Sequence, residues 1–399
     1  MSGALDGILV ADFSRVLAGP LATMHLADLG ATVIKVERPG AGDDTRSWGP
    51  PWSSTSSTYF DSVNRSKRSL TLDLSDEADR GLAHELARRA DVLVENFRPG
   101  ALDRFGLGYE QVRPDNRGVV YASVTGFGRT GGADLMGYDF LVQAVGGLMS
   151  VTGEAGGPPT KTGVAVVDVL TGKDLSIGVL AALVARGRTG QGCRVEVDLL
   201  SSLLAAMVNQ GQSTLATGTA PGRMGNSHPS ITPYETLRCG GGLVAVACGN
   251  DGQFARLAAA LGRPGLAEDP RLATNAARVA HRADLVQILE SLLAAHDSAT
   301  WQRILTRVGV PAGRVGDLAD AFALAESLGL HPWTDVGEPG APCPQVRHPV
   351  QYGPALTVPP TAPPQLGEHD AQLRDWLHHP DAPVPPTPAH RIPSEEVPR

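Results

Sequence analysis

Apolar and polar positions in the first forty residues follow two alternating patterns. Residues 7–13 and 31–37 are short runs rich in aliphatic side chains, which is typical of buried strands. Between them, residues 21–29 have a helical pattern that follows Pro20, a residue suited to a first helical turn, and ends at Gly30. The order strand–helix–strand predicts a βαβ unit, and its apolar strands predict a parallel sheet covered on both faces.

The same alternation continues to about residue 215. We expect an amphipathic helix capped by Ser75, strands over residues 91–97 and 118–125, and long buried helices over residues 169–185 and 199–215. Strands that alternate with helices in this way are typical of an open α/β domain. The sequence therefore predicts a large α/β domain over residues 1–215.

A different pattern begins after residue 225. Residues 234–239 and 243–248 flank a glycine-rich turn, which predicts a hairpin, and helical patterns follow at 250–262, 281–296 and 299–308. These elements predict a smaller α+β domain over residues 225–325. Beyond His331 the chain is rich in proline, and residues 380–399 hold too few apolar side chains to fold, so we expect a disordered tail there.

Composition and charge restrict the class of protein. The chain has 399 residues, 42% of them hydrophobic, and a formal net charge of -8. The acidic balance argues against nucleic acid or an anionic membrane as the main partner. The longest apolar run, residues 177–185, is too short to cross a bilayer, and the N-terminus does not resemble a signal peptide. We therefore expect a soluble, cytoplasmic protein.

Metal and disulfide chemistry find no support in the sequence. The four cysteines are too scattered for a disulfide framework or a CxxC metal site. His228 lies in a loop with no second histidine or carboxylate at metal-ligand spacing, so we predict no metal site. A lone loop histidine is usually a surface residue, which leaves a role for His228 at a substrate open.

One glycine motif is compatible with a dinucleotide site but lacks its context. Residues 126–131 read Gly-Phe-Gly-Arg-Thr-Gly and follow a predicted strand. The residues after the motif do not begin a clear helix, and no second strand ends in an acidic residue at the required distance. We expect a glycine loop near a ligand and not a nicotinamide-binding loop.

Arginines follow the predicted strands. Arg38 ends the second strand, Arg98 and Arg104 follow the strand over 91–97, and the run 64–69 reads Asn-Arg-Ser-Lys-Arg-Ser. Parallel sheets bind ligands at the carboxyl ends of their strands, and guanidinium groups pair with phosphate through two hydrogen bonds. These cations therefore indicate a phosphate-bearing ligand, with ordinary surface charge as the alternative.

Asp168 closes the apolar segment 163–168 and precedes the helix expected over 169–185. Its simplest interpretation is a helix-capping carboxylate. The same position also suits a nucleophile, because a helix N-terminus favours an ionised carboxylate and presents backbone N–H groups to a developing oxyanion. Both interpretations remain open from the residues alone.

A colinear series of motifs resembles the class III CoA-transferase family, which includes formyl-CoA and carnitine CoA-transferases. The series extends from about residue 5 to Leu377, and its members are Ser14-Arg-Val-Leu-Ala-Gly-Pro20, Val33-Ile-Lys-Val-Glu-Arg-Pro39, Gly42-Asp-Asp-Thr-Arg46, Asn64-Arg-Ser-Lys-Arg-Ser69, Glu95-Asn-Phe-Arg-Pro-Gly100, Gly137-Tyr-Asp139, Val164-Ala-Val-Val-Asp-Val-Leu-Thr-Gly172 and Gly225-Asn-Ser-His-Pro229. The resemblance implies an interlocked homodimer. Each chain would have a Rossmann-like large domain, completed by residues 330–378, and a small domain.

The resemblance also assigns roles to residues. Asp168 matches the catalytic nucleophile, and His228 lies in a motif loop at the expected substrate side. Tyr59 matches an active-site position. Positions expected to contact coenzyme A are Val16, Leu17, Arg38, Leu72, Asn96, Phe97, Arg98, Arg104 and Tyr138. Coenzyme A and its acyl thioesters would be substrates, and no tightly bound cofactor is expected.

The implied reaction moves CoA from an acyl-CoA to a carboxylic acid through an aspartyl anhydride and an aspartyl thioester. Leu17 and residues 227–230 differ from the glutamine and the tetraglycine loop of formyl-CoA transferase, which disfavours formyl-CoA and oxalate and favours succinyl-CoA or another dicarboxylic acyl group. The alternatives are a racemase of α-methylacyl-CoA, for which Tyr138 is a poor base, and a non-catalytic CoA-binding relative.

Overall fold

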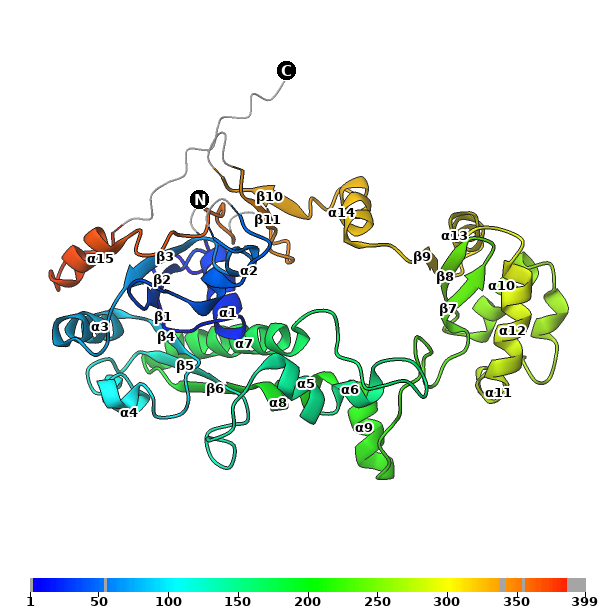
Figure 1. Ribbon diagram of the computed structural model, residues 1–399, viewed down its shortest axis with the longest axis horizontal. Coiled ribbons are helices and arrows are strands. Elements are labelled where there is room, and N and C mark those ends of the chain that lie inside the picture. The colour runs from blue at the N-terminus through cyan, green and yellow to red at the C-terminus, as the bar shows by residue number, and fades with distance from the viewer. Residues whose placement is uncertain (1–2, 54–55, 338–341, 354–355, 386–399) are drawn as a thin grey trace, which may run out of the picture. The chain divides into compact units, whose positions relative to one another are not determined.

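The protein is built around a six-stranded parallel sheet (Figure 1). The computed structural model describes residues 3–53, 56–337, 342–353 and 356–385. The strands are β1 (Leu9–Asp12), β2 (Thr32–Glu37), β3 (Lys67–Thr71), β4 (Val92–Glu95), β5 (Val120–Thr125) and β6 (Arg194–Asp198). Their order is β3-β2-β1-β4-β5-β6, and each neighbouring pair is parallel. The predicted α/β fold with a parallel sheet is confirmed, in the strand order of Rossmann domains.

Helices cover both faces of this sheet. On one face, α3 (Glu77–Arg89) and α15 (Asp370–Leu377) share a buried cluster with the strands, in which Leu86, Leu93 and Trp376 take part. Alternate strand residues such as Val10 and Val33 are also buried, on the side where α1 (Ala18–Asp28) and α7 (Val166–Thr189) pack together. Burial on both sides explains why the central strands β1 and β4 consist mainly of aliphatic residues.

The carboxyl-terminal part of the chain packs on the sheet that the amino-terminal part forms. The Asp370 side chain accepts a hydrogen bond from the backbone N–H of Thr71 at 2.7 Å, and Arg374 pairs with Asp79 at 2.6 Å. Farther along, the Ala382 carbonyl accepts a hydrogen bond from the Trp376 indole at 3.0 Å. Of the tail expected over 380–399, residues 386–399 lie outside the described residues.

The chain divides into two compact units. The first comprises residues 3–146 and 163–212 with the described part of 331–399, and the second comprises residues 147–162 and 213–330. The first unit also contains η1 (Asp44–Ser47), α2 (Thr58–Asp61), η2 (Asp103–Phe105), α4 (Tyr109–Val112), α5 (Asp139–Val145), α8 (Leu199–Ala206), β10 (Trp333–Asp335) and β11 (Pro344–Val346).

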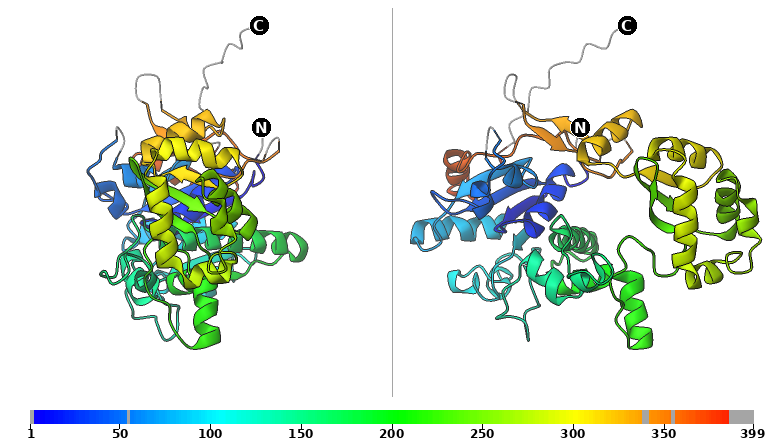
Figure 2. Two further views of the ribbon diagram at one scale, coloured as in Figure 1. Left: turned by 90° about the vertical axis from the view of Figure 1, so that its right-hand side faces the viewer. Right: turned by 45° about the vertical axis from the view of Figure 1, so that its right-hand side comes forward.

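The second unit has its own hydrophobic core, formed between a small antiparallel sheet and helices. Its elements are α6 (Leu148–Val151), β7 (Tyr234–Cys239), β8 (Gly242–Ala247), α10 (Asp251–Ala260), η3 (Pro264–Ala267), α11 (Asn275–Ala280), α12 (Arg282–Leu293), α13 (Ser298–Arg307), β9 (Ala312–Arg314) and α14 (Leu318–Ser327). Strands β7 and β8 form the predicted hairpin. Figure 2 shows these strands (green) against the helices (yellow), where Leu237, Phe254 and Leu289 are fully buried.

Two expectations about secondary structure are wrong. The single helix expected over 199–215 is two helices, α8 and α9 (Val208–Thr217), because Val208 has a positive φ of 32° that interrupts the helical backbone. Helix α9 contains no buried residue, so it is not the buried helix that its apolar residues suggested. The helix expected to be capped by Ser75 is capped one residue later, where the Asp76 side chain accepts from the N–H groups of Ala78 and Asp79.

Candidate active site

Two cavities lie at the carboxyl ends of the sheet strands in the first unit, near the position where the strand order reverses between β1 and β4. This position is where open α/β sheets bind their ligands. We call the first the aromatic cavity; it is lined by the ends of β1, β2 and β3 and by residues 97–105. The second, the Asp168 cavity, is lined by residues after β1, β4 and β5 and by the first turn of α7.

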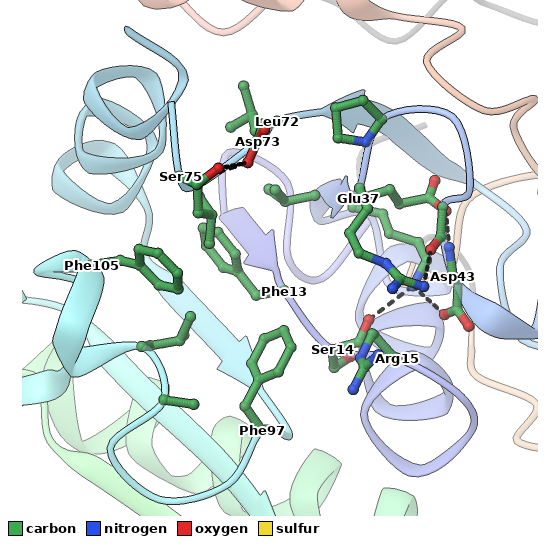
Figure 3. Close-up of a pocket in the computed structure, with 18 of the residues that line it drawn as sticks. Phe13, Ser14, Arg15, Glu37, Asp43, Leu72, Asp73, Ser75, Phe97 and Phe105 are labelled. Atoms are coloured by element: carbon green, nitrogen blue, oxygen red, sulfur yellow. Dashed lines mark hydrogen bonds and ion pairs between the residues drawn. The ribbon is translucent and has the colours of Figure 1, made fainter. Parts of the chain in front are cut away.

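The aromatic cavity has a volume of about 440 Å³. Figure 3 shows the rings of Phe13, Phe97 and Phe105 turned toward it. Arg38 and Arg104 also line the cavity, and the Arg104 guanidinium lies 4.8 Å from the centre of the Phe105 ring. Aromatic walls beside exposed arginines suit a planar base that carries phosphate groups. Leu72 lines the same cavity, so the structure brings four predicted CoA-contacting residues together.

The Asp168 cavity is smaller, about 240 Å³. The predicted residues that line it are Val16, Leu17, Asn96, Phe97, Arg98, Tyr138 and Asp168. Phe97 lines both cavities, so the two are neighbours along the same edge of the sheet. The glycine motif at 126–131 forms part of the wall and does not open a helix, because the next helix, α5, begins only at Asp139.

Asp168 occupies the first turn of α7, and this corrects the prediction that it precedes the helix. Helix α7 begins at Val166, and no strand forms over residues 163–168. The local N-cap residue, Ala165, has no side chain that could cap the helix. Instead, the Asp139 carboxylate accepts hydrogen bonds from the N–H groups of Val167 at 2.8 Å and Asp168 at 3.3 Å. A carboxylate from 28 residues earlier thus caps the helix.

This cap also changes the expected source of oxyanion stabilisation. The N–H groups of Val167 and Asp168 are bonded to Asp139, and those of Val166 and Val169 donate to the carbonyls of Val164 and Ala165. The first turn of α7 therefore has no free N–H group for an oxyanion. The expectation that this helix start supplies the donors is wrong, because its orphan N–H groups are satisfied within the protein.

The electrostatic environment of Asp168 favours its neutral form. Burial, and then the nearby Asp139 carboxylate, raise the pKa of Asp168 to about 7. The same two carboxylates also act on Tyr59: burial, followed by Asp168 and Asp139, raises the pKa of the Tyr59 phenol to about 12. A carboxyl group with so strongly shifted a pKa in the wall of a cavity is a functional-site candidate.

Tyr59 packs behind the Asp168 cavity and does not line it. Its ring meets the Trp48 ring edge-on at 5.2 Å and packs against the buried cluster that contains Leu17. Tyr138 is the N-cap residue of α5 and is 57% exposed, so it stands at the rim of the cavity.

His228 lies in the second unit. Its Nδ1 accepts a hydrogen bond from the N–H of Ser230 at 3.1 Å, and its ring centre is 5.2 Å from that of Tyr234. These local contacts give the side chain a structural function within its own loop.

The loop between β1 and α1 is held in an unusual conformation. Val16 has a φ of 71°, a left-handed value that is costly for a β-branched residue. The Asp43 carboxylate accepts from the Val16 N–H at 3.2 Å, and the Asn96 side chain both accepts from the Arg15 N–H at 2.9 Å and donates to the Arg15 carbonyl at 2.7 Å. Both the oxygen and the nitrogen of the Asn96 side-chain amide are therefore bonded to the Arg15 backbone, and these bonds hold the loop in place.

The cations at 64–69 serve neither a ligand nor the surface. Arg65 pairs with Asp28 at 2.6 Å, and the Lys67 ammonium contacts the Asp12 carboxylate at 3.0 Å. Arg68 donates to Gln372 and to a carbonyl of the C-terminal segment. All three side chains are buried, so they hold the fold together and are not available to a phosphate.

Two further classes of site receive no support. The part of the chain that the structure describes contains no group of three histidine, cysteine, aspartate or glutamate side chains placed to hold a metal ion. Among the same residues, no helix combines the length and apolar character needed to cross a membrane.

The family model described as CoA-transferase family III matches residues 5–370. The chain belongs to this family. Among curated relatives, it is 42% identical to a succinate–glutarate CoA-transferase of Agrobacterium fabrum, over 92% of this chain and 94% of the relative. It is also 42% identical to an acetyl-CoA:oxalate CoA-transferase of Acetobacter aceti, over 82% and 84%. The recognised resemblance is thus confirmed, and the protein is a class III CoA-transferase.

A solved structure from the same family agrees in fold. A CAIB/BAIF family protein from Brucella suis is 42% identical and superposes with a TM-score of 0.85, covering 94% of this chain and all of that one. Within this CoA-transferase, the residues that sequence reasoning missed are Arg15, Asp43 and Asp139. All three residues lie inside motifs of the family series, but the contacts that reveal their roles join residues 27 or more positions apart.

Proposed function

We propose that the enzyme moves CoA from succinyl-CoA, or another dicarboxylic acyl-CoA, to a dicarboxylic acid through covalent intermediates on Asp168. The observation that carries this proposal is the Asp168 carboxyl group in the wall of a cavity at the strand ends, with a pKa raised to about 7. The names of the relatives support the substrate class, because succinate, glutarate and oxalate are all dicarboxylic acids. The sequence disfavoured oxalate, but the name of the Acetobacter relative is a reason to include oxalate among the acceptor acids that are tested.

The two adjoining cavities suit the two ends of CoA. We place the adenine base among Phe13, Phe97 and Phe105, with Arg38 and Arg104 beside the phosphate groups. The pantetheine arm would then pass Phe97, which lines both cavities, and bring the thioester to Asp168. Val16, Leu17, Arg98 and Tyr138 line the cavity around the reacting end. No tightly bound cofactor is needed for this chemistry.

The reaction follows from a carboxylate nucleophile and a thiol leaving group. An Asp168 oxygen attacks the thioester carbonyl and expels CoA as a thiolate, which leaves an acyl-aspartyl anhydride. The thiolate attacks the aspartyl carbonyl, releases the donor acid as a carboxylate and forms an aspartyl-CoA thioester. The acceptor carboxylate attacks this thioester and expels the thiolate again, and the thiolate takes the acceptor acyl group from the new anhydride. Asp168 is regenerated, and no proton is consumed.

The environment that raises the pKa of Asp168 also favours the covalent steps of this reaction. A carboxylate that is poorly solvated and close to Asp139 is held less favourably in its free, charged state. Forming an anhydride or thioester removes that charge. The environment therefore lowers the free energy of the covalent intermediates relative to the free carboxylate, at the cost of partial protonation near neutral pH.

We also propose that the enzyme acts as the interlocked homodimer implied by the family, in the cytoplasm. Apolar side chains on the first unit support a subunit contact, because Ile177 and Val184 on α7 and Leu204 on α8 are 66%, 64% and 55% exposed. Exposed aliphatic groups of this kind are typical of interfaces. Residues 1–215 with 330–378 would form the CoA-binding domain and residues 225–325 the small domain, and His228 remains a candidate for substrate binding.

The test is a transfer assay with succinyl-CoA and glutarate. Asp168→Asn should reduce turnover by at least about 1000-fold, because an amide cannot form the anhydride. Asp174→Asn is the matched control, since Asp174 lies on the same helix six residues farther along and lines neither cavity. Substantial transfer by the Asp168 variant, or none by the wild type with any dicarboxylic acid, would refute the proposal.

A further inference from the structure

Arg15 lies where the two cavities meet. It lines both the aromatic cavity and the Asp168 cavity, and its side chain is 36% exposed. Figure 3 shows it at the edge of the aromatic cavity, close to Phe97. Its guanidinium carbon lies 5.2 Å from the centre of the Phe97 ring, a distance at which a cation and an aromatic face attract each other.

The backbone of this residue is fixed more firmly than a surface arginine requires. Asn96 holds both the N–H and the carbonyl of Arg15, and the next residue, Val16, is kept in its left-handed conformation by Asp43. Strain of this kind persists only where the surrounding structure enforces it, and it concentrates at functional sites. These contacts therefore fix the backbone position of Arg15, from which its side chain extends.

The guanidinium itself is incompletely satisfied. Its Nη1 pairs with the Asp44 carboxylate at 3.1 Å, whereas its Nε is buried and has no hydrogen-bond partner among the described residues. A buried donor without an acceptor is costly in a native protein, unless a ligand supplies the acceptor. A carboxylate is a suitable ligand, because it accepts hydrogen bonds from a guanidinium edge through two oxygens.

We propose that Arg15 binds the distal carboxylate of the dicarboxylic acyl group and of the acceptor acid while Asp168 reacts with the other end. Arg15 and Arg98 are the cations that line the Asp168 cavity among the described residues, and Arg98 is exposed. Of these two cations, Arg15 is the one with a fixed backbone and a buried donor that has no partner within the described part of the chain. This inference rests on the proposed function and deepens it, because it names the residue that distinguishes dicarboxylic from monocarboxylic substrates.

The diphosphate of CoA is the alternative anionic group that Arg15 could bind, because it also has to pass between the two cavities. The two sources differ in which substrates they affect. A diphosphate contact acts on every acyl-CoA and on free CoA. A contact to the distal carboxylate acts on succinyl-CoA and glutarate, and is absent from butyryl-CoA and pentanoate, which have the same chain lengths without that group.

The experiment compares kcat/KM for these two pairs of substrates in the wild type, Arg15→Gln and Arg15→Lys, together with free CoA binding by calorimetry. Arg15→Gln should lower the preference for succinyl-CoA over butyryl-CoA, and for glutarate over pentanoate, by about 30-fold or more, since hydrogen bonds to charged groups contribute on this scale. Arg15→Lys should retain part of the preference, because a lysine keeps the charge but loses the planar fork. CoA binding should change less than threefold.

Arg186→Gln is the matched control, because Arg186 also pairs with an aspartate, Asp91, but lies at the end of α7 away from the site. It should leave the preference unchanged. An equal loss for all acyl-CoAs with weakened CoA binding would assign Arg15 to the diphosphate and overturn the inference, as would an unchanged preference. Activity of the Arg15 variants with butyryl-CoA shows that the site is folded. Absence of any transfer by the wild type would instead remove the proposed function itself.

Discussion

Asp168→Asn should stabilise the protein at alkaline pH even as it abolishes transfer. Burial and Asp139 raise the pKa of Asp168 from 3.8 to about 7 in the folded state. Between these two values the folded state holds a proton that the unfolded state has released, so the free energy of unfolding falls as the pH rises through this window. A difference of about three pKa units corresponds to about 4 kcal/mol, which is the largest effect expected. Asparagine resembles the protonated carboxyl group of Asp168, so the substitution removes this loss in the free energy of unfolding.

The assay is chemical or thermal unfolding of the wild type and Asp168→Asn from pH 4.5 to 8.5. The stability difference in favour of the variant should be smallest near pH 4.5, grow as the pH rises and level off above pH 7. Asp174→Asn supplies the baseline for loss of one aspartate from the same helix. Parallel curves for wild type and Asp168→Asn across the whole range would show that Asp168 is an ordinary solvated carboxylate and would refute the environment described for it.

Two other predictions concern binding and the choice of chemistry. Arg38→Ala and Arg104→Ala should each raise KM for succinyl-CoA about tenfold and leave KM for glutarate and kcat nearly unchanged. The reason is that a phosphate contact acts on binding and not on the chemical step. Steady-state kinetics with both substrates varied measure these constants, and a large fall in kcat would contradict the prediction. Incubation with a 2-methylacyl-CoA in deuterium oxide should leave the α-hydrogen in place by nuclear magnetic resonance, since Tyr138 lies at the rim as a poor base; rapid α-deuteration without transfer would indicate a racemase.

The elements that the sequence predicted correctly are those whose side chains report burial directly. Strands β1 and β2 are aliphatic runs, and so is the hairpin strand β8. Strand β3 was missed because Lys67 and Arg68 lie within it and were interpreted as cations for a phosphate-bearing ligand or for the surface. Their partners, Asp12 and Gln372, are 55 and 304 residues away, so nothing local signals that these charges are buried. Strand β6 was missed for a related reason, since charged Arg194, Glu196 and Asp198 alternate with its two valines.

The features of the candidate site likewise divide into those that the sequence predicted and those that it did not. Arg38 and Arg104 were predicted together because residues that follow parallel strands meet at one edge of the sheet, whereas Phe97 was predicted from the family resemblance. The helix start at Val166 was not, because Asp139 supplies the cap from another segment. Long-range hydrogen bonds of this kind leave no periodic pattern in the sequence.

The most direct test of the central claim is mass spectrometry of the protein after brief incubation with succinyl-CoA and acid quenching. We expect the peptide that contains Asp168 to gain the mass of CoA less one water, with the added mass removed by glutarate and absent from Asp168→Asn. A covalent adduct on any other residue, or turnover without an adduct on Asp168 at any time point, would contradict the account.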